Sequence, residues 1–176
     1  MDVKAALAGQ YHAALDALKG AIKGCPEDLW EDGKTSAPYW QVVYHTLFYT
    51  HLYLSEELKA FEAWEHHREE YQSMRVKPAR GAKKGLVIVK YTKEEMLAYW
   101  TFVDGHVDAQ MKKMDLEAGK CGFWWYEPMN KLEHQINNIR HIQHHAAALA
   151  MRLRVNGGKG VGWVGARRVK KKGAKK

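Results

Sequence analysis

The sequence lacks the features that mark disulfide-bonded, secreted and membrane-spanning proteins. Its only cysteines, Cys25 and Cys121, form no CxxC pair, which excludes a disulfide framework and leaves reduced thiols as the expected state. No apolar run approaches the roughly 18 residues that a membrane span needs, and residues 1–15 lack the apolar stretch of a secretory signal. We therefore expect a cytoplasmic protein with no membrane contact.

An excess of either charge is also missing from most of the chain. Residues 1–155 carry 20 Lys+Arg and 20 Asp+Glu, whereas residues 156–176 carry eight Lys+Arg and no acid, so the tail holds the whole net charge of +8. This division predicts a neutral domain over residues 1–155 and a basic C-terminal tail over residues 156–176. Such a tail is usually solvated and less often binds nucleic acid.

Apolar residues at helical spacing predict four amphipathic helices, and no solenoid-type repeat is present. The helices are expected at residues 3–22, 38–63, 92–114 and 128–155. Ser36 is the expected N-cap of the second helix, with Pro38 in its first turn. Thr92 and Glu95 form a capping box that opens the third, and Pro128 suits the first turn of the fourth.

The four helices and the segment between the second and third define the expected architecture. Residues 64–91 are polar and basic, with one short apolar run at residues 86–89, and predict a long connection. Four amphipathic helices with such a connection are typical of an all-α four-helix bundle, which builds its sites from side chains on facing helices. The expected core stripes are Met96, Trp100, Val103, Val107, Met111 and Met114 on the third helix, and Leu132, Ile136, Ile139, Ala146, Leu149 and Leu153 on the fourth.

Three of the ten histidines form a candidate metal site. His141 and His145 are four residues apart in HIQHHAAALAMRLR, and His45 lies in PYWQVVYHTLFYTHLYL. Side chains four apart on a helix share one face with Cβ atoms about 6 Å apart, so two imidazoles can hold one ion. Ten histidines give HxxxH pairs easily by chance, and the glutamate of HExxH is absent, which disfavours a zinc protease. Because His141 and His145 lie at the edge of the apolar stripe, we expect the site at the mouth of a cleft.

The remaining histidines are not expected to bind that ion. His134 lies roughly 10 Å from His141 along the helix axis, and His51 is on another face of its helix. His144 points about a quarter turn away from His145, and the pair at residues 66–67 is expected to be solvated because it lies in a polar stretch.

These two histidine-bearing segments, with a Trp shortly before His45 and a Gly-rich stop after NNIRHIQHHAAALAMRLR, resemble the DinB/YfiT-like superfamily of metal-binding four-helix bundles. The resemblance spans the order and spacing of the helices over residues 1–155. It implies a divalent-metal site formed by His45, His141 and His145. It also implies kinship with transferases that use low-molecular-weight thiols, and a homodimer; fold and site carry over from such a likeness, but the reaction does not.

The leading functional hypothesis is a metal-dependent enzyme, a thiol S-transferase or a hydrolase, that acts on a small molecule. Zn²⁺ or Ni²⁺ at the three histidines would leave an open position for water or a thiol, and coordination would make either a nucleophile at neutral pH. Imidazole suits both metals, so the sequence does not choose between them. Side chains expected to orient the ligands or a bound water are Gln41, Tyr49, Asn137 and Asn138, although plain packing is the alternative role for each.

Two other functions stay open at this point. The bundle could be non-catalytic, with metal binding that only stabilises the fold or a dimer. Alternatively, the basic tail could bind nucleic acid without sequence preference, although the chain shows no recognition helix or base-stacking platform. A homodimer also agrees with an apolar stripe broader than one bundle covers.

Overall fold

The structure, a computed structural model, describes residues 1–32, 37–69, 71–74 and 89–167 of the 176-residue chain. Within these residues all regular secondary structure is helical, which confirms the predicted all-α class. The elements are α1 (Val3–Gly24), α2 (Glu27–Trp30), α3 (Tyr39–Leu54), α4 (Lys93–Lys113) and α5 (Lys131–Val155), with 3-10 turns at Leu58–Ala60 and Trp124–Tyr126. The predicted Ser36 cap and the apolar residues 86–88 lie outside the described part of the chain.

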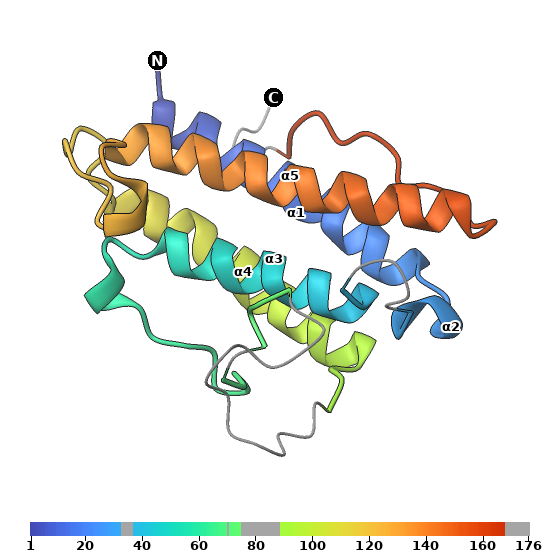
Figure 1. Cartoon of the computed structure of the whole chain (residues 1–176). Helices are drawn as coiled ribbons and strands as arrows, with labels where there is room; N and C mark the ends of the chain where they lie inside the picture. Colours follow the sequence, from blue (N-terminus) through green and yellow to red (C-terminus); the bar gives the residue numbers. More distant parts are fainter. Residues whose placement is uncertain (33–36, 70, 75–88, 168–176) are drawn as a thin grey trace.

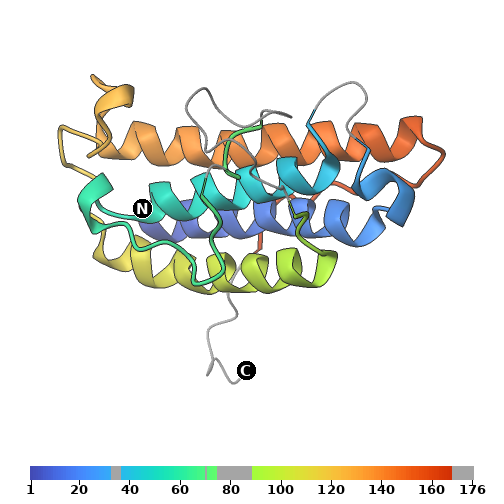
Figure 2. The same cartoon turned by 60° about the horizontal axis from the view of Figure 1, so that its bottom comes forward.

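The four long helices run side by side (Figures 1 and 2). Helix α1 packs against α4 and α5, and α3 packs against the same two helices. Each helix therefore turns an apolar face to the middle, and the core draws on all four. The expected stripe of α4 is confirmed, because all six of its apolar residues are buried. Among the described helices, none is both long and apolar enough to cross a membrane.

Local capping signals place the start of α4 as expected but move the start of α5. The Thr92 side chain accepts from the Glu95 backbone N–H and the Glu95 carboxylate accepts from that of Thr92, a complete capping box. At α5, Asn130 is the N-cap and accepts from the Glu133 backbone N–H at 2.8 Å. Pro128 lies in the preceding loop, so its expected place in the first turn was wrong.

Helix α3 ends at Leu54, nine residues before the predicted end at Ala63. The following segment leaves the helix to pair with the loop before α5: the Leu58 backbone N–H donates to the Gly122 carbonyl at 3.2 Å. Gly122 has φ +89°, and a Cβ there would lie 2.7 Å from the Glu56 carbonyl oxygen, so only glycine fits. Tertiary contacts therefore end α3, and they leave no local signal in the sequence.

The expected stripe of α5 is confirmed except at one position, and Leu132 and Ile139 in its first half are partly buried and pack against the core. Ala146, Leu149 and Leu153 are buried, but Ile136 is 47% exposed. Polar residues face the core in its place: Gln135 donates to the Tyr53 carbonyl at 2.9 Å and accepts from the Tyr11 hydroxyl at 2.7 Å. Because these buried polar atoms have hydrogen-bond partners, their burial avoids the cost of unpaired polar groups in the core.

The first part of the predicted tail folds back onto α1. We call residues 158–167 the C-terminal strap. The Gln10 side-chain amide donates to the Gly165 carbonyl, and the Arg167 backbone N–H donates to the Gly9 carbonyl. Arg167 also forms ion pairs with Asp16 and Asp104. Trp163, in contrast, remains 83% exposed.

Candidate metal centre

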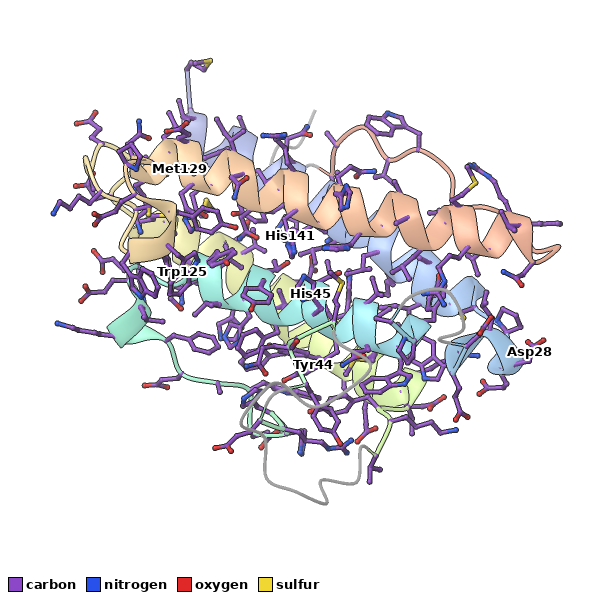
Figure 3. The ribbon with its side chains drawn as sticks, in the orientation of Figure 1. Asp28, Tyr44, His45, Trp125, Met129 and His141 are labelled. Atoms are coloured by element: carbon purple, nitrogen blue, oxygen red, sulfur yellow. The ribbon has the colours of Figure 1, made fainter. Side chains whose placement is uncertain are left out.

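The packing of α3 against α5 brings His45, His141 and His145 together. His45 lies near the middle of α3, and His141 lies on the side of α5 that faces it (Figure 3). His145 follows His141 by one turn of the same helix. The three rings form a triangle with centroid separations of 5.2 Å (45–141), 4.9 Å (45–145) and 4.6 Å (141–145). One nitrogen of each ring lies within 4.8 Å of the others. The three predicted ligands thus meet from two distant stretches of sequence.

The spacing of these nitrogens fits a single divalent ion. Two nitrogens bound tetrahedrally at zinc–nitrogen distances of about 2.0–2.1 Å lie about 3.3 Å apart. The Nε2 atoms of His45 and His141 are 3.2 Å apart. The Nδ1 atom of His141 is buried and has no hydrogen-bond partner among the described residues. The nitrogen of His145 lies within 4.8 Å of the other two, and a set of three imidazole nitrogens suits Zn²⁺ or Ni²⁺.

A backbone carbonyl orients the His45 ring. The Nδ1 atom of His45 lies 2.7 Å from the Gln72 carbonyl oxygen, which can only accept, so Nδ1 carries the proton and donates. The unprotonated Nε2 then points to the other two histidines. Metal-binding histidines usually make this kind of hydrogen bond through the nitrogen that does not bind metal.

Gln41 holds the segment that supplies this carbonyl. Its side-chain amide donates to the Ser73 carbonyl at 2.7 Å, one residue beyond Gln72. Gln41 and His45 are one turn apart on α3, and their side chains donate hydrogen bonds to consecutive carbonyls of the same segment. Gln41 can therefore help to orient His45 indirectly, through the backbone of residues 72–73.

Burial keeps the three imidazoles in the form that binds metal. Burial and the neighbouring imidazoles lower the pKa of His141 to about 3 and that of His145 to about 4. Burial also lowers the pKa of His45. The three rings are consequently neutral at pH 7, and neutral imidazole is the ligand form.

The histidines form one wall of a cavity of about 620 Å³, within the range of small-molecule sites. His45 and His141 are partly exposed to it, whereas His145 is 8% exposed, in agreement with the expected site at the mouth of a cleft. The other lining residues come from α3, the segment after it and the loop before α5: Phe48, Tyr49, Leu52, Tyr53, Leu58, Phe61, Gln72, Trp125 and Tyr126.

The other three residues expected to orient the ligands have different surroundings. Tyr49 packs its ring against His45, with centroids 4.8 Å apart, and lines the cavity. Asn137 lines a separate shallow hollow that shares His141 with the cavity. Asn138 lies in the core and donates to the Thr50 carbonyl at 3.3 Å, so we assign it to core packing.

Of the histidines excluded by sequence, His134 and His51 lie away from this site, whereas the exposed His144 packs its ring against that of His145 with centroids 5.0 Å apart. His134 is buried between Tyr53 and Phe123, and His51 packs against Tyr99 on α4. His66 is exposed as expected. His67 is not simply solvated, because it is half-buried and hydrogen-bonded to the Tyr44 hydroxyl.

Sequence reasoning did not identify two parts of the site. The Gln72 carbonyl is a backbone group in an irregular segment, so its residue type carries no signal. Trp125 and Tyr126 belong to an aromatic cluster visible in the sequence, but only the fold shows that they line the cavity and that Trp124 is 73% exposed outside it.

Comparisons with protein-family models, with curated proteins and with solved structures found no match.

Proposed function

We propose that the protein is a DinB/YfiT-like four-helix bundle and a metal-dependent enzyme that acts on a small molecule. The observation that carries the proposal is the convergence of three imidazole nitrogens, two of them 3.2 Å apart, at the wall of a cavity of about 620 Å³. His45, His141 and His145 would hold Zn²⁺ or Ni²⁺. Such an ion supplies Lewis-acid activation of water or a thiol at neutral pH.

The protein's own residues have three roles in this proposal. The histidines are ligands and not bases, because each ligating nitrogen gives up its lone pair. The hydrogen bonds from His45 to Gln72 and from Gln41 to Ser73 fix the ring that comes from α3. The aromatic side chains around the cavity limit the access of bulk water to the reacting groups, which strengthens electrostatic interactions there. Thiol transfer and hydrolysis both remain within this proposal.

The test is metal content followed by turnover, on protein without a histidine tag. We expect stoichiometric Zn²⁺ or Ni²⁺ in the wild type and its loss in His141→Ala. His144→Ala is the matched control, because His144 is exposed on the same helix and is not one of the three clustered histidines. Thiol-transfer and hydrolysis assays should then show activity in the wild type and the control alone.

Three outcomes count against the proposal in different ways. A wild type that takes up no divalent metal, or a His141→Ala variant that retains it, overturns the metal site. Metal binding without turnover in either assay overturns the enzymatic part and leaves a non-catalytic metal-binding bundle.

A further inference from the structure

The described walls of the cavity beside the three histidines carry no formal charge. None of the twelve described lining residues is Asp, Glu, Lys or Arg. The polar groups are the three histidines, three tyrosines and Gln72, and the rest are apolar or aromatic. A site for a highly charged ligand would need opposite charges on these walls, because burying an unpaired charge is unfavourable.

The metal site adds positive charge that the protein does not balance, and this step rests on the proposed function. Three neutral imidazoles around a divalent ion would leave two positive charges, and the described lining residues include no carboxylate. The shallow hollow next to it shares His141 and Tyr126 with the cavity, and among the described residues that line it the charged one is Arg140, which is again positive. Since the described walls supply no negative charge, we expect the charge that lowers the energy of such a site to come from the ligand.

The aromatic side chains define the part of the ligand away from the metal. Phe48 and Phe61 meet edge to face with centroids 5.5 Å apart, and so do Tyr53 and Tyr126 at 5.4 Å. Trp125 is 38% exposed and donates from its indole N–H to the Tyr53 hydroxyl at 3.3 Å, which holds its ring at the cavity. Such faces favour flat or aliphatic groups over hydroxylated or charged ones.

We infer that the cavity binds a small molecule with one anionic head, a thiolate or a carboxylate, and an apolar body the size of an aromatic ring. The head lies toward His45, His141 and His145, and the body lies against Trp125 and the neighbouring aromatic rings. A volume of about 620 Å³ holds such a molecule with room for a second small reactant. The inference excludes polyanionic thiols as the preferred ligand.

The experiment compares matched probes on protein loaded with Co²⁺ after its metal content is measured. Benzyl mercaptan is compared with 2-mercaptoethanesulfonate, which carries a second negative charge, and phenylacetate with acetate. Binding is followed by the visible absorption of Co²⁺. We expect each aromatic probe to bind at least about tenfold more tightly than its partner, because burial of a ring contributes more than 1.4 kcal/mol. The more tightly bound of the two aromatic probes identifies the head.

Variants of the aromatic wall locate the body of the ligand. Trp125→Ala should weaken binding of benzyl mercaptan about threefold to tenfold, the range expected for one lost aromatic contact. Trp125→Phe should retain most of the affinity, which separates a lost contact from a folding defect. Trp124→Ala is the matched control, because Trp124 is exposed and does not line the cavity, and its affinity should equal that of the wild type.

The ligand class and the proposed function fail in different ways. A protein that takes up Co²⁺ but binds 2-mercaptoethanesulfonate as tightly as benzyl mercaptan overturns the ligand class and leaves the metal site intact. The same conclusion follows if Trp124→Ala and Trp125→Ala weaken binding equally. A protein that takes up no metal overturns both.

Discussion

At the scale of single residues, Gln41 is the most informative side chain outside the three histidines. It does not line the cavity, yet its amide holds the backbone segment whose Gln72 carbonyl orients His45. We predict that Gln41→Ala lowers metal affinity about 10–100-fold, the usual effect of removing a group that orients a ligand. Competition with a chelator measures this affinity.

The control for Gln41→Ala is Gln110→Ala, a half-buried glutamine on α4 that lines a different hollow. Its metal affinity should not change. Because Gln41 is buried, its loss also lowers the free energy of unfolding, and a thermal melt of the metal-free protein measures that part separately. Unchanged metal affinity in Gln41→Ala would show that the Gln72 carbonyl needs no support from α3.

A second residue-scale prediction concerns His12, which lies between α1 and α4. Its ring contacts Asp104 at 2.7 Å and Asp108 at 3.2 Å. The hydrogen bond to Asp104 raises the pKa of His12, although burial and the nearby Arg167 oppose it. The folded state therefore binds the proton more tightly than the unfolded state does. The resulting stabilisation is complete below pH 6.5, the usual pKa of histidine, and is lost as pH rises through the raised value.

Urea unfolding across pH 5–9 checks this sign. The free energy of unfolding of the wild type should fall relative to that of His12→Gln as pH rises above 6.5. His66→Gln, a change at an exposed histidine, should leave the wild-type profile unaltered. A wild-type advantage that grows with pH would have the wrong sign and would refute the assignment.

The residues of the site were predictable to different degrees for physical reasons. His45, His141 and His145 were found because a helix places residues four apart on one face, and because the resemblance supplied the partner segment. For Asn138 the sequence left orientation of a ligand and plain packing both open, since a position one turn from a ligand says nothing about which neighbour the side chain meets. Backbone groups such as the Gln72 carbonyl cannot be predicted from residue type, because every residue carries one.

At the scale of elements, the contact between α1 and the C-terminal strap explains an otherwise unfavourable glycine. Gly20 lies inside α1, where glycine is destabilising by roughly 1 kcal/mol relative to alanine. A Cβ at Gly20 would lie 2.9 Å from Cγ1 of Val161. The glycine therefore lets Val161 approach the helix backbone, so that the strap packs closely against α1.

Two glycine-to-alanine changes test this explanation. Gly105 on α4 has nothing within 4 Å of its Cβ position, so Gly105→Ala should raise the free energy of unfolding by roughly 0.5–1 kcal/mol. Gly20→Ala should raise the free energy of unfolding by less than this, or lower it, because Val161 has to move. The double variant Gly20→Ala with Val161→Ala should recover the gain that helix propensity offers. Equal gains from both single changes would show that the strap does not press on α1.

Elements were predictable where their signals are local. The start of α4 follows from Thr92 and Glu95, which bond within one turn, and its buried stripe follows from simple periodicity. The end of α3 depends on Gly122, which is far away in sequence. The N-terminal half of α5 turns Gln135 inward because Tyr11 and Tyr53 receive it, and apolar periodicity cannot anticipate partners of that kind.

At the scale of the whole molecule, the three histidines link two helices that do not follow one another in the chain. An ion held by His45 on α3 and by His141 and His145 on α5 would be bound only in the folded state, because no unfolded chain keeps residues about 100 positions apart together. Binding that is restricted to the folded state adds stability through mass action, about 2.7 kcal/mol when the free ligand concentration is 100 times its dissociation constant.

We therefore predict that Ni²⁺ in such excess raises the melting temperature of the wild type by on the order of 5–10 °C, given the usual shift of about 2–4 °C per kcal/mol for a chain of this size. His141→Ala should show almost no rise, since only His45 on α3 and His145 on α5 remain to bind the ion. His144→Ala should behave as the wild type does. An equal rise in all three proteins would mean that Ni²⁺ acts elsewhere on the surface and that α3 and α5 are held together by packing alone.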